Sequence, residues 1–490
     1  MSNQQNAPII DALKRYINDK VIRFHMPGHK GRQLADSLLN DLLGSRVFAA
    51  DVTNVPGLDD LHQTHGVIKE AQEMAAAAFG ADHSYFLVNG SSCGLQALIM
   101  AVCNQGDRIL VPRNMHRSIL SGIILSGAVP VYFKPEYDDG YGLFLGASPE
   151  TIAGSLDCHP EVKAVILVSP TYHGITSNVA RIAAIVHARN IPLLIDEAHG
   201  PHLHFHEALP RTALEEGADA SVQGIHKILA AFTQASMLHI KGNIIDKYKL
   251  EACLRLLQST STSYLLLASL DAARAQIAAR GKQLIQIALE LSDYLRQEIV
   301  GMTGFSVLGP DIVGQKGVWG LDPTKITISV KGLGVTGLWA ERWLREKHHI
   351  QIEMSDIFNL LLIIGFGNSR TDTQHFLKAL HEMRKYIDQN PIRSYHSRAL
   401  REGNIMPEIP ELVISPREAF GAPTLTLPLN EAVGRISTEA VACYPPGIPV
   451  LCPGERVSGE IIDYLTAKRN LGVHFQGCSD LNVYTLRVVR

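Results

Sequence analysis

Short apolar segments alternate with helical patterns through the first half of this 490-residue chain. The expected strands are residues 85–88, 108–111, 130–133, 164–168 and 193–195. This alternation indicates strand–helix–strand units and a mostly parallel sheet covered by helices on both faces. In such a sheet, ligands bind beyond the carboxyl ends of the strands. Any chemistry in this half of the chain is therefore expected at one edge of the sheet.

Four polar stretches directly follow expected strands, and all of them belong to that edge. They are residues 89–94 (NGSSCG), 114–118 (NMHRS), 169–174 (SPTYHG) and 196–200 (DEAHG). A fifth stretch, SVQGIHKIL, places Lys227 among apolar neighbours. Burial lowers the pKa of a lysine and frees its amine to attack a carbonyl, although an ordinary surface lysine fits the same pattern.

Three further features of these stretches suggest a bound phosphorylated ring. Gly90, Ser91 and Ser92 open an expected helix, where backbone amides and hydroxyls can hold a phosphate; an ordinary helix cap is the alternative. Asp196 ends an apolar strand and can pair with a protonated ring nitrogen, or simply cap a loop. His116 and His199 lie at the same sheet edge, where two histidines favour a functional role.

The pattern of the second half of the chain predicts further domains. A long helix at 265–300 is expected to connect the first domain to a second α/β unit. That unit has expected strands at 325–330 and 350–353 and helices at 337–347 and 371–387. The predicted division is an N-terminal arm (1–20), a large domain (21–280), a small α/β domain (281–390) and a C-terminal α+β domain (391–490).

Composition excludes several classes of protein. With 46% hydrophobic and 19% charged residues and a net charge of −3, the chain gives no reason to expect nucleic acid or an anionic membrane as partner. The seven cysteines form no C-x-x-C pair, so neither a disulfide framework nor a metal site is expected. No signal peptide or eighteen-residue apolar run is present, which makes the cytoplasm the expected location.

Several motifs together resemble one family. The motifs are FHMPGHKG (24–31), DVTNVPGLDDLH (51–62), SPTYHG, DEAHG, the His-Lys pair at 226–227 and YPPGIPVLCPGE (444–455). In this order they resemble the Orn/Lys/Arg decarboxylases, which are fold-type-I, aminotransferase-like pyridoxal-phosphate enzymes. The matches run from about residue 22 to residue 456, and the chain looks like a short form without the family's N-terminal wing domain.

The resemblance implies roles for the residues named above. Lys227 is expected to bond pyridoxal 5'-phosphate covalently, Asp196 to pair with the pyridine nitrogen and His116 to stack on the ring. Gly90, Ser91, Ser92 and His226 are expected near the phosphate, and His199 is a further catalytic candidate. Many relatives have Ser-Thr before the His-Lys pair, whereas this chain has Gly224-Ile225. That departure removes two hydroxyls and leaves more of the phosphate binding to Ser91, Ser92 and His226.

The expected substrate is a basic amino acid. Glu353 and Asp356 are candidates for binding its cationic tail, although exposed strand-end carboxylates explain them equally well. Glu455 is a candidate for the pocket rim. Arg370 is a candidate for binding the substrate carboxylate, and the alternative is a surface residue at the start of a helix. Residues 332–337 form a G-x-G-x-x-G pattern, which on its own suggests a dinucleotide, but it belongs to the second domain.

The expected reaction is decarboxylation of L-arginine to agmatine, with lysine or ornithine as alternative substrates. A homodimer or a dimer of dimers is expected, with both chains lining each site. One alternative function is a pyridoxal-phosphate aminotransferase. It would also use Lys227 and Asp196, but it does not explain the YPPGIP motif. A non-catalytic regulator on the same scaffold needs a DNA-binding module, for which the first twenty residues are too few.

Overall fold

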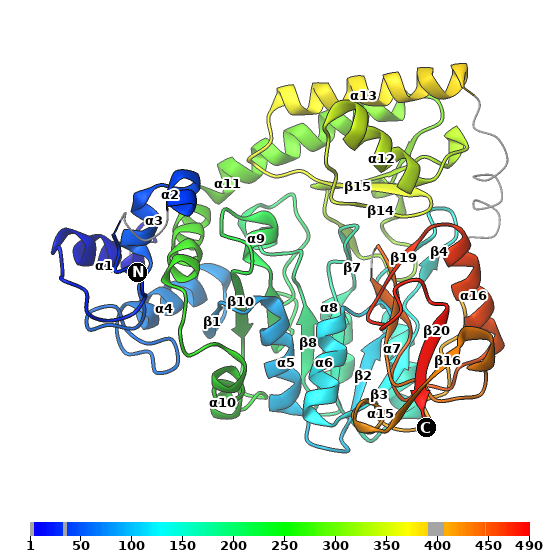
Figure 1. The fold of residues 1–490 in the computed structure, drawn as a ribbon, viewed down its shortest axis with the longest axis horizontal. Helices are drawn as coiled ribbons and strands as arrows, with labels where there is room; N and C mark the ends of the chain where they lie inside the picture. Colours follow the sequence, from blue (N-terminus) through cyan, green and yellow to red (C-terminus); the bar gives the residue numbers. More distant parts are fainter. Residues whose placement is uncertain (1–3, 33–36, 391–405, 446) are drawn as a thin grey trace.

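The computed structural model describes residues 4–32, 37–390, 406–445 and 447–490. Its centre is a seven-stranded sheet in the order β1-β10-β9-β8-β6-β2-β3 (Figure 1). The strands are β1 (His83–Leu87), β10 (Ser236–Ile240), β9 (Ala220–Gln223), β8 (Leu193–Asp196), β6 (Val162–Val168), β2 (Arg108–Pro112) and β3 (Val129–Phe133). β10 alone runs in the direction opposite to the other six strands, so its pairs with β1 and β9 are antiparallel and the remaining pairs are parallel. The predicted fold class, a mostly parallel α/β sheet, is confirmed.

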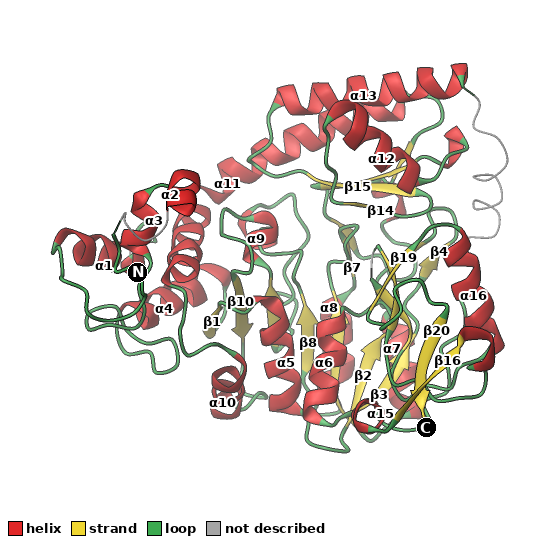
Figure 2. Cartoon of the chain, viewed as in Figure 1, coloured by secondary structure: helices red, strands yellow, loops and turns green. Residues whose placement is uncertain are grey.

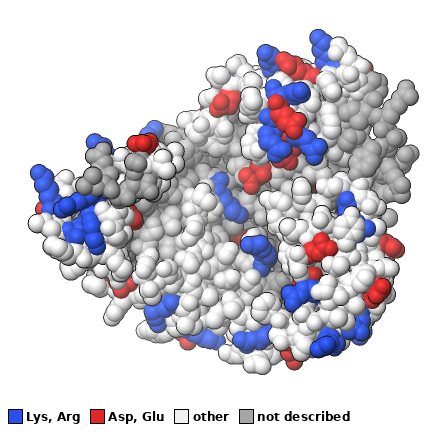
Figure 3. Space-filling model, in the orientation of Figure 1, with Lys and Arg blue, Asp and Glu red and all other residues white. Residues whose placement is uncertain are grey.

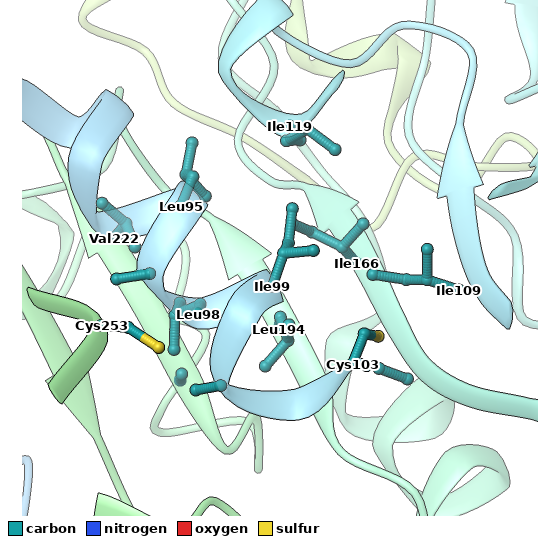
Figure 4. Packing of buried hydrophobic residues seen from close by; sticks show 14 of the residues in the cluster. Leu95, Leu98, Ile99, Cys103, Ile109, Ile119, Ile166, Leu194, Val222 and Cys253 are labelled. Atoms are coloured by element: carbon teal, nitrogen blue, oxygen red, sulfur yellow. The ribbon is translucent and has the colours of Figure 1, made fainter. Parts of the chain in front are cut away.

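Alternating side chains of the strands feed two separate cores. In β6, Ala164 and Ile166 join the cluster on one face, while Val165 and Leu167 join the cluster on the other. This period of two is what a strand buried on both sides requires. Figure 4 shows Leu95, Leu98 and Ile99 of one covering helix lying close to strand residues such as Leu194.

Helices cover both faces of the sheet, as Figure 2 shows in red. One face carries α5 (Gly90–Val102), α6 (Arg117–Ser126) and α10 (Lys247–Leu257), and the other carries α7 (Pro149–Cys158) and α8 (Val179–His187). The remaining helices of this part are α1 (Pro8–Asn18), α2 (Ser37–Leu43), α3 (Ser45–Ala50), α4 (Val67–Phe79) and α9 (Ile225–Ile228). Because the strands other than β10 run in one direction, their carboxyl ends lie at the same edge of the sheet.

A 37-residue helix, α11 (Tyr264–Val300), leads from the large domain to the core of a small domain. Its first half packs with α1 and α4, while Leu291, Leu295 and Ile299 pack in the small domain (Figure 1). The predicted connector helix is confirmed. The small domain has a sheet in the order β11-β13-β15-β14. Its elements are β11 (Ser306–Val307), β13 (Lys325–Ser329), α12 (Gly337–His348), β14 (Met354–Ser355), β15 (Asn359–Ile363) and α13 (Arg370–Gln389).

One predicted strand in this domain is wrong. Residues 350–353 are not in a strand, because the chain leaves α12 through the left-handed residue His349 and begins pairing with β15 only at Met354. Ile352 is nevertheless buried in the small-domain core. An apolar alternation of this kind cannot distinguish a strand from a buried loop.

The C-terminal part packs beside β2 and β3 of the large sheet (Figure 1). It consists of α15 (Pro416–Gly421), β16 (Thr424–Pro428), β17 (Val441–Tyr444), β18 (Ile448–Leu451), α16 (Gly459–Asn470), β19 (His474–Gln476) and β20 (Thr485–Val489). It has a hydrophobic cluster of its own. The exact division into an arm and three domains stays a proposal, because α11 belongs to the cores of both the large and the small domain.

Candidate active site

Lys227 lies at the sheet edge on the single-turn helix α9, directly after β9. Its Nζ is 2.9 Å from Nε2 of His199 and 5.5 Å from the centre of the Tyr172 ring. Burial lowers the pKa of Lys227, while the charges of Asp196 and Glu353 partly offset that shift. A lowered pKa increases the fraction of neutral amine, which is the nucleophilic form.

Asp196 ends β8 and is 4% exposed. One carboxylate oxygen accepts a hydrogen bond from the Ala198 N–H at 3.2 Å. Burial raises the pKa of Asp196, and the nearby His116 and Lys227 act in the opposite direction. A cation placed against this carboxylate, such as a protonated ring nitrogen, therefore removes an electrostatic cost.

His116 forms the N-cap of α6, and this fixes its ring. Its Nδ1 accepts the Ser118 N–H at 3.2 Å and lies 2.7 Å from the Ser118 hydroxyl. Since Nδ1 is the acceptor, Nε2 carries the proton in the neutral ring. Burial lowers the pKa of His116, which favours that neutral form. The sequence pattern placed His116 in a loop; the structure adds that a helix cap orients it.

His199 is fully packed behind the lysine. Its ring centre is 4.5 Å from that of Tyr172, and burial lowers its pKa well below the usual value. The neutral ring accepts a hydrogen bond from Lys227 at Nε2, and its buried Nδ1 has no partner among the described residues. His199 is therefore placed to orient the amine of Lys227 as a hydrogen-bond acceptor.

The N-terminus of α5 faces the same pocket. Asn89, its N-cap, makes no capping hydrogen bond through its side chain, so the first backbone N–H groups of α5 stay available to an anion. The Ser91 hydroxyl donates to that of Ser236 at 3.1 Å. His226 donates from Nδ1 to the Ala235 carbonyl at 2.9 Å, so its Nε2 is an acceptor unless the ring is protonated.

All eight residues expected to hold the cofactor or catalyse line one pocket. They are Gly90, Ser91, Ser92, His116, Asp196, His199, His226 and Lys227. The pocket also contains residues to which the sequence assigned no role, namely Asn114, Pro170, Tyr172, Thr233 and Gln234. Tyr172 belongs to the SPTYHG stretch, so its place after a strand was a usable signal. Thr233 and Gln234 precede β10, which runs in the opposite direction, and no sequence signal marks them.

The expected substrate residues are distributed differently. Glu353 is exposed and lines neither of the pockets that contain Lys227 or Asp356, but a separate one beside Ile352 and Ile364. Its charge nevertheless acts to raise the pKa of both Lys227 and Tyr172. Asp356 lines a second pocket, which adjoins the first through Asn114, Val168 and Tyr172. Its carboxylate accepts hydrogen bonds from the Phe358 N–H at 2.7 Å and from the Asn359 N–H at 2.8 Å.

The expectation for Glu455 is wrong, and of the two alternatives for Arg370 the structure shows the helix start. Glu455 is not at a pocket rim: it is 0% exposed, and both carboxylate oxygens bind the guanidinium of Arg113. Arg370 opens α13, and its guanidinium lies 3.1 Å from the centre of the Tyr294 ring, outside the pocket lining. The glycine pattern at 332–337 serves packing, because a Cβ on Gly337 would lie 2.3 Å from the Asn359 carbonyl oxygen.

Comparison with known protein families identifies the family of this chain. The model of the Orn/Lys/Arg decarboxylase major domain matches residues 7–372, and that of the family's C-terminal domain matches residues 401–480. This chain belongs to the Orn/Lys/Arg decarboxylase family. The family and its fold-type-I structural neighbours are pyridoxal-phosphate enzymes.

Among the similar proteins are arginine decarboxylases and lysine decarboxylases. The chain is 40% identical over 495 aligned residues to the arginine decarboxylase of Halalkalibacterium halodurans, covering 100% of this chain and 99% of the relative. It is 39% identical over 488 residues to the arginine decarboxylase of Bacillus subtilis, with the same coverage. A crystal structure of the Francisella novicida lysine decarboxylase superposes with a TM-score of 0.85 and 25% identity, covering 100% of this chain and 82% of that one.

The residues present fit pyridoxal phosphate. The open N-terminus of α5 with Ser91 and Ser92 suits the phosphate, the buried carboxylate of Asp196 suits a cationic ring nitrogen, and Lys227 lines the same pocket. At Gly224, a Cβ would lie 2.9 Å from the Ala198 carbonyl oxygen, and Ile225 is fully buried. The departure from the usual Ser-Thr therefore brings α9 close to the loop that carries His199.

Proposed function

We propose that this protein decarboxylates L-arginine to agmatine and CO₂, with pyridoxal 5'-phosphate bonded to Lys227. The observation that carries the proposal is the full-length similarity to two arginine decarboxylases, combined with one pocket that gathers every expected cofactor residue. Bound pyridoxal phosphate supplies a cationic ring that takes up the electron pair left when the carboxylate departs as CO₂. The remaining tasks belong to side chains of this chain.

Each of these side chains has a task that follows from its position. Asp196 holds the proton at the ring nitrogen, because its buried carboxylate is stabilised by a cation. His116, held by Ser118, packs against the ring face. Lys227 protonates the carbon that loses CO₂ and regains a proton from water, while the neutral His199, whose Nε2 is 2.9 Å from the amine, accepts its hydrogen bond and orients it. The overall reaction consumes one proton for each CO₂ released.

Glu353 is the proposed partner of the cationic substrate tail. Its charge acts on both Lys227 and Tyr172. Asp356 is the second candidate, since it lines the adjoining pocket, but its carboxylate already accepts hydrogen bonds within its own turn. Lysine is the alternative substrate, favoured by the similarity to a lysine decarboxylase over the whole chain.

A homodimer, or a dimer of such dimers, is the proposed assembly, in the cytoplasm. Apolar side chains near the N-terminus are strongly exposed, including Ile22 (71%), Phe24 (93%) and Met26 (65%). Large exposed apolar groups mark interfaces. The middle of the face shown in Figure 3 is mostly uncharged over the large domain, with charges of both signs gathered over α12 and α13. No helix in the described part of the chain is long and apolar enough to cross a bilayer.

The test is a direct assay. The purified protein, supplied with pyridoxal phosphate, is incubated separately with arginine, lysine and ornithine, and CO₂ and the amine product are measured. The proposal predicts equal amounts of CO₂ and agmatine from arginine and a higher kcat/KM for arginine than for the other two. Preference for lysine moves the assignment to the alternative substrate, and formation of a keto acid without CO₂ refutes decarboxylation.

A further inference from the structure

A buried ion pair joins the C-terminal domain to the sheet edge. Nη1 of Arg113 is 2.6 Å from one carboxylate oxygen of Glu455, and Nη2 is 2.9 Å from the other. The two side chains are 4% and 0% exposed. Glu455 also accepts the Cys452 N–H at 2.7 Å, and Arg113 donates to the Val450 carbonyl at 2.8 Å. Such a two-pronged pair fixes orientation as well as distance.

On the large-domain side, Arg113 of this pair belongs to the loop between β2 and α6, which also carries His116. Arg113 follows β2, its backbone N–H donates to the Phe133 carbonyl at 2.8 Å, and its guanidinium lies 5.0 Å from the Tyr132 ring centre. Asn114 comes next; it lines both pockets, and its buried Oδ1 has no partner among the described residues. His116 follows two residues later as the N-cap of α6.

On the other side, the pair holds a hairpin of the C-terminal domain. Val450 belongs to β18, and residues from β17, β18 and their turn line the second pocket: Cys443, Tyr444, Pro445, Ile448 and Val450. The pair therefore connects the wall that carries Asn114 and His116 to the wall formed by this hairpin. The two walls come from parts of the chain more than 300 residues apart.

We propose that Arg113 and Glu455 are positioning residues for the reaction: they set His116 against the cofactor ring and Asn114 at the junction of the two pockets. This inference rests on the proposed function, because it assigns the His116 ring its partner. A buried ion pair adds little net stability compared with apolar residues of similar size, whereas it restricts geometry. Replacing both partners with apolar residues should therefore keep the fold and lose the positioning.

The test compares three variants with the wild-type holoenzyme. They are Glu455→Asp, which keeps the charge and withdraws it by one methylene, Glu455→Gln, and the double variant Arg113→Met/Glu455→Leu. The control is Asp271→Asn, which breaks another buried pair, Asp271–Arg274 at 2.5 Å, in α11 and outside both pockets. The measurements are the thermal midpoint, kcat and KM, the absorbance spectrum of the bound cofactor, and its dissociation constant.

The expected result is a separation of stability from function. The double variant should melt close to wild type, yet show a shifted cofactor spectrum, a roughly tenfold weaker cofactor affinity and a kcat lowered by about ten- to a hundredfold. Glu455→Asp should show a smaller change of the same kind, and Asp271→Asn a lower midpoint with an unchanged spectrum and kcat.

Three outcomes would overturn the inference without touching the proposed function. A folded double variant with wild-type spectrum, affinity and kcat removes the positioning role. Equal losses of kcat in Asp271→Asn assign the effect to general destabilisation. If none of the Arg113 and Glu455 variants yields folded holoenzyme, the pair is a folding requirement and positioning is rejected. An inactive wild-type protein, in contrast, refutes the proposed function itself.

Discussion

Asp196 and Lys227 are buried side chains whose pKa values are shifted in opposite directions by the fold. Burial favours the neutral form of each, so the pKa of the acid rises and that of the amine falls. A cationic ring that bonds Lys227 and contacts Asp196 reverses the cost at the carboxylate. At the scale of single residues, the pocket is therefore prepared for a cofactor of that charge.

Asp196→Asn tests this electrostatic role. The amide has nearly the same size but no charge to hold a proton at the ring nitrogen, so kcat should fall at least about a hundredfold, or roughly 2.7 kcal/mol of barrier. Asp219→Asn is the matched control, since Asp219 is also buried but accepts the Leu193 N–H at the start of the same strand. A full kcat in Asp196→Asn contradicts the assignment.

Glu197, the neighbour of Asp196, predicts a pH dependence of stability. Burial raises its pKa to about 7, whereas an unfolded chain has about 4.3. Between these values the folded state binds more protons, so the free energy of unfolding falls as pH rises, by up to about 4 kcal/mol in total. Glu197→Gln should remove this loss, which thermal midpoints of both proteins at pH 5 and pH 8 will measure. Equal pH dependence in the two proteins contradicts the prediction.

Glu353→Gln tests the proposed tail partner. Losing a charged contact to the substrate should raise KM for arginine about tenfold, equivalent to about 1.4 kcal/mol, with a smaller effect on kcat. The exposed Glu346 on α12 offers the control Glu346→Gln. If KM stays at the wild-type value, Asp356 becomes the preferred candidate.

At the scale of elements, strand ends were the predictable part of the site. Asp196, His116 and Ser91 follow parallel strands, so the pattern alone brought them to one edge. Gln234 precedes the antiparallel strand β10, and Glu455 is held by a contact with Arg113, 342 residues away. Local patterns do not encode such long-range contacts, which explains why the expectation for Glu455 was wrong and why its contact with Arg113 was not predicted.

Gly224→Ser tests the close approach of α9 to the His199 loop. The change restores the hydroxyl common in relatives, but its Cβ lies too near the Ala198 carbonyl oxygen. We expect a loss of about 1–3 kcal/mol of stability and weaker cofactor binding, because α9 must shift. Gly154→Ala in α7, where no atom lies within 4 Å of the added carbon, is the control and should cost nothing. An improved cofactor affinity in Gly224→Ser refutes this explanation.

At the scale of the whole molecule, α11 packs into two hydrophobic cores, and the Arg113–Glu455 pair joins the C-terminal part to the large domain. The apolar residues near the N-terminus remain exposed in the single chain. Phe24→Asp should therefore weaken the proposed dimer and shift the sedimentation coefficient toward that of one chain. A wild-type protein that sediments as a monomer at all concentrations while fully active contradicts the assembly.

The central claim is the covalent bond between Lys227 and pyridoxal phosphate. The direct measurement is borohydride reduction of the purified holoenzyme, followed by peptide mass mapping, alongside Lys227→Ala. The account predicts a cofactor adduct on Lys227, loss of the near-visible absorbance on reduction, and no adduct in the variant. An adduct on another lysine, or none with protein that still releases CO₂ from arginine, would contradict it.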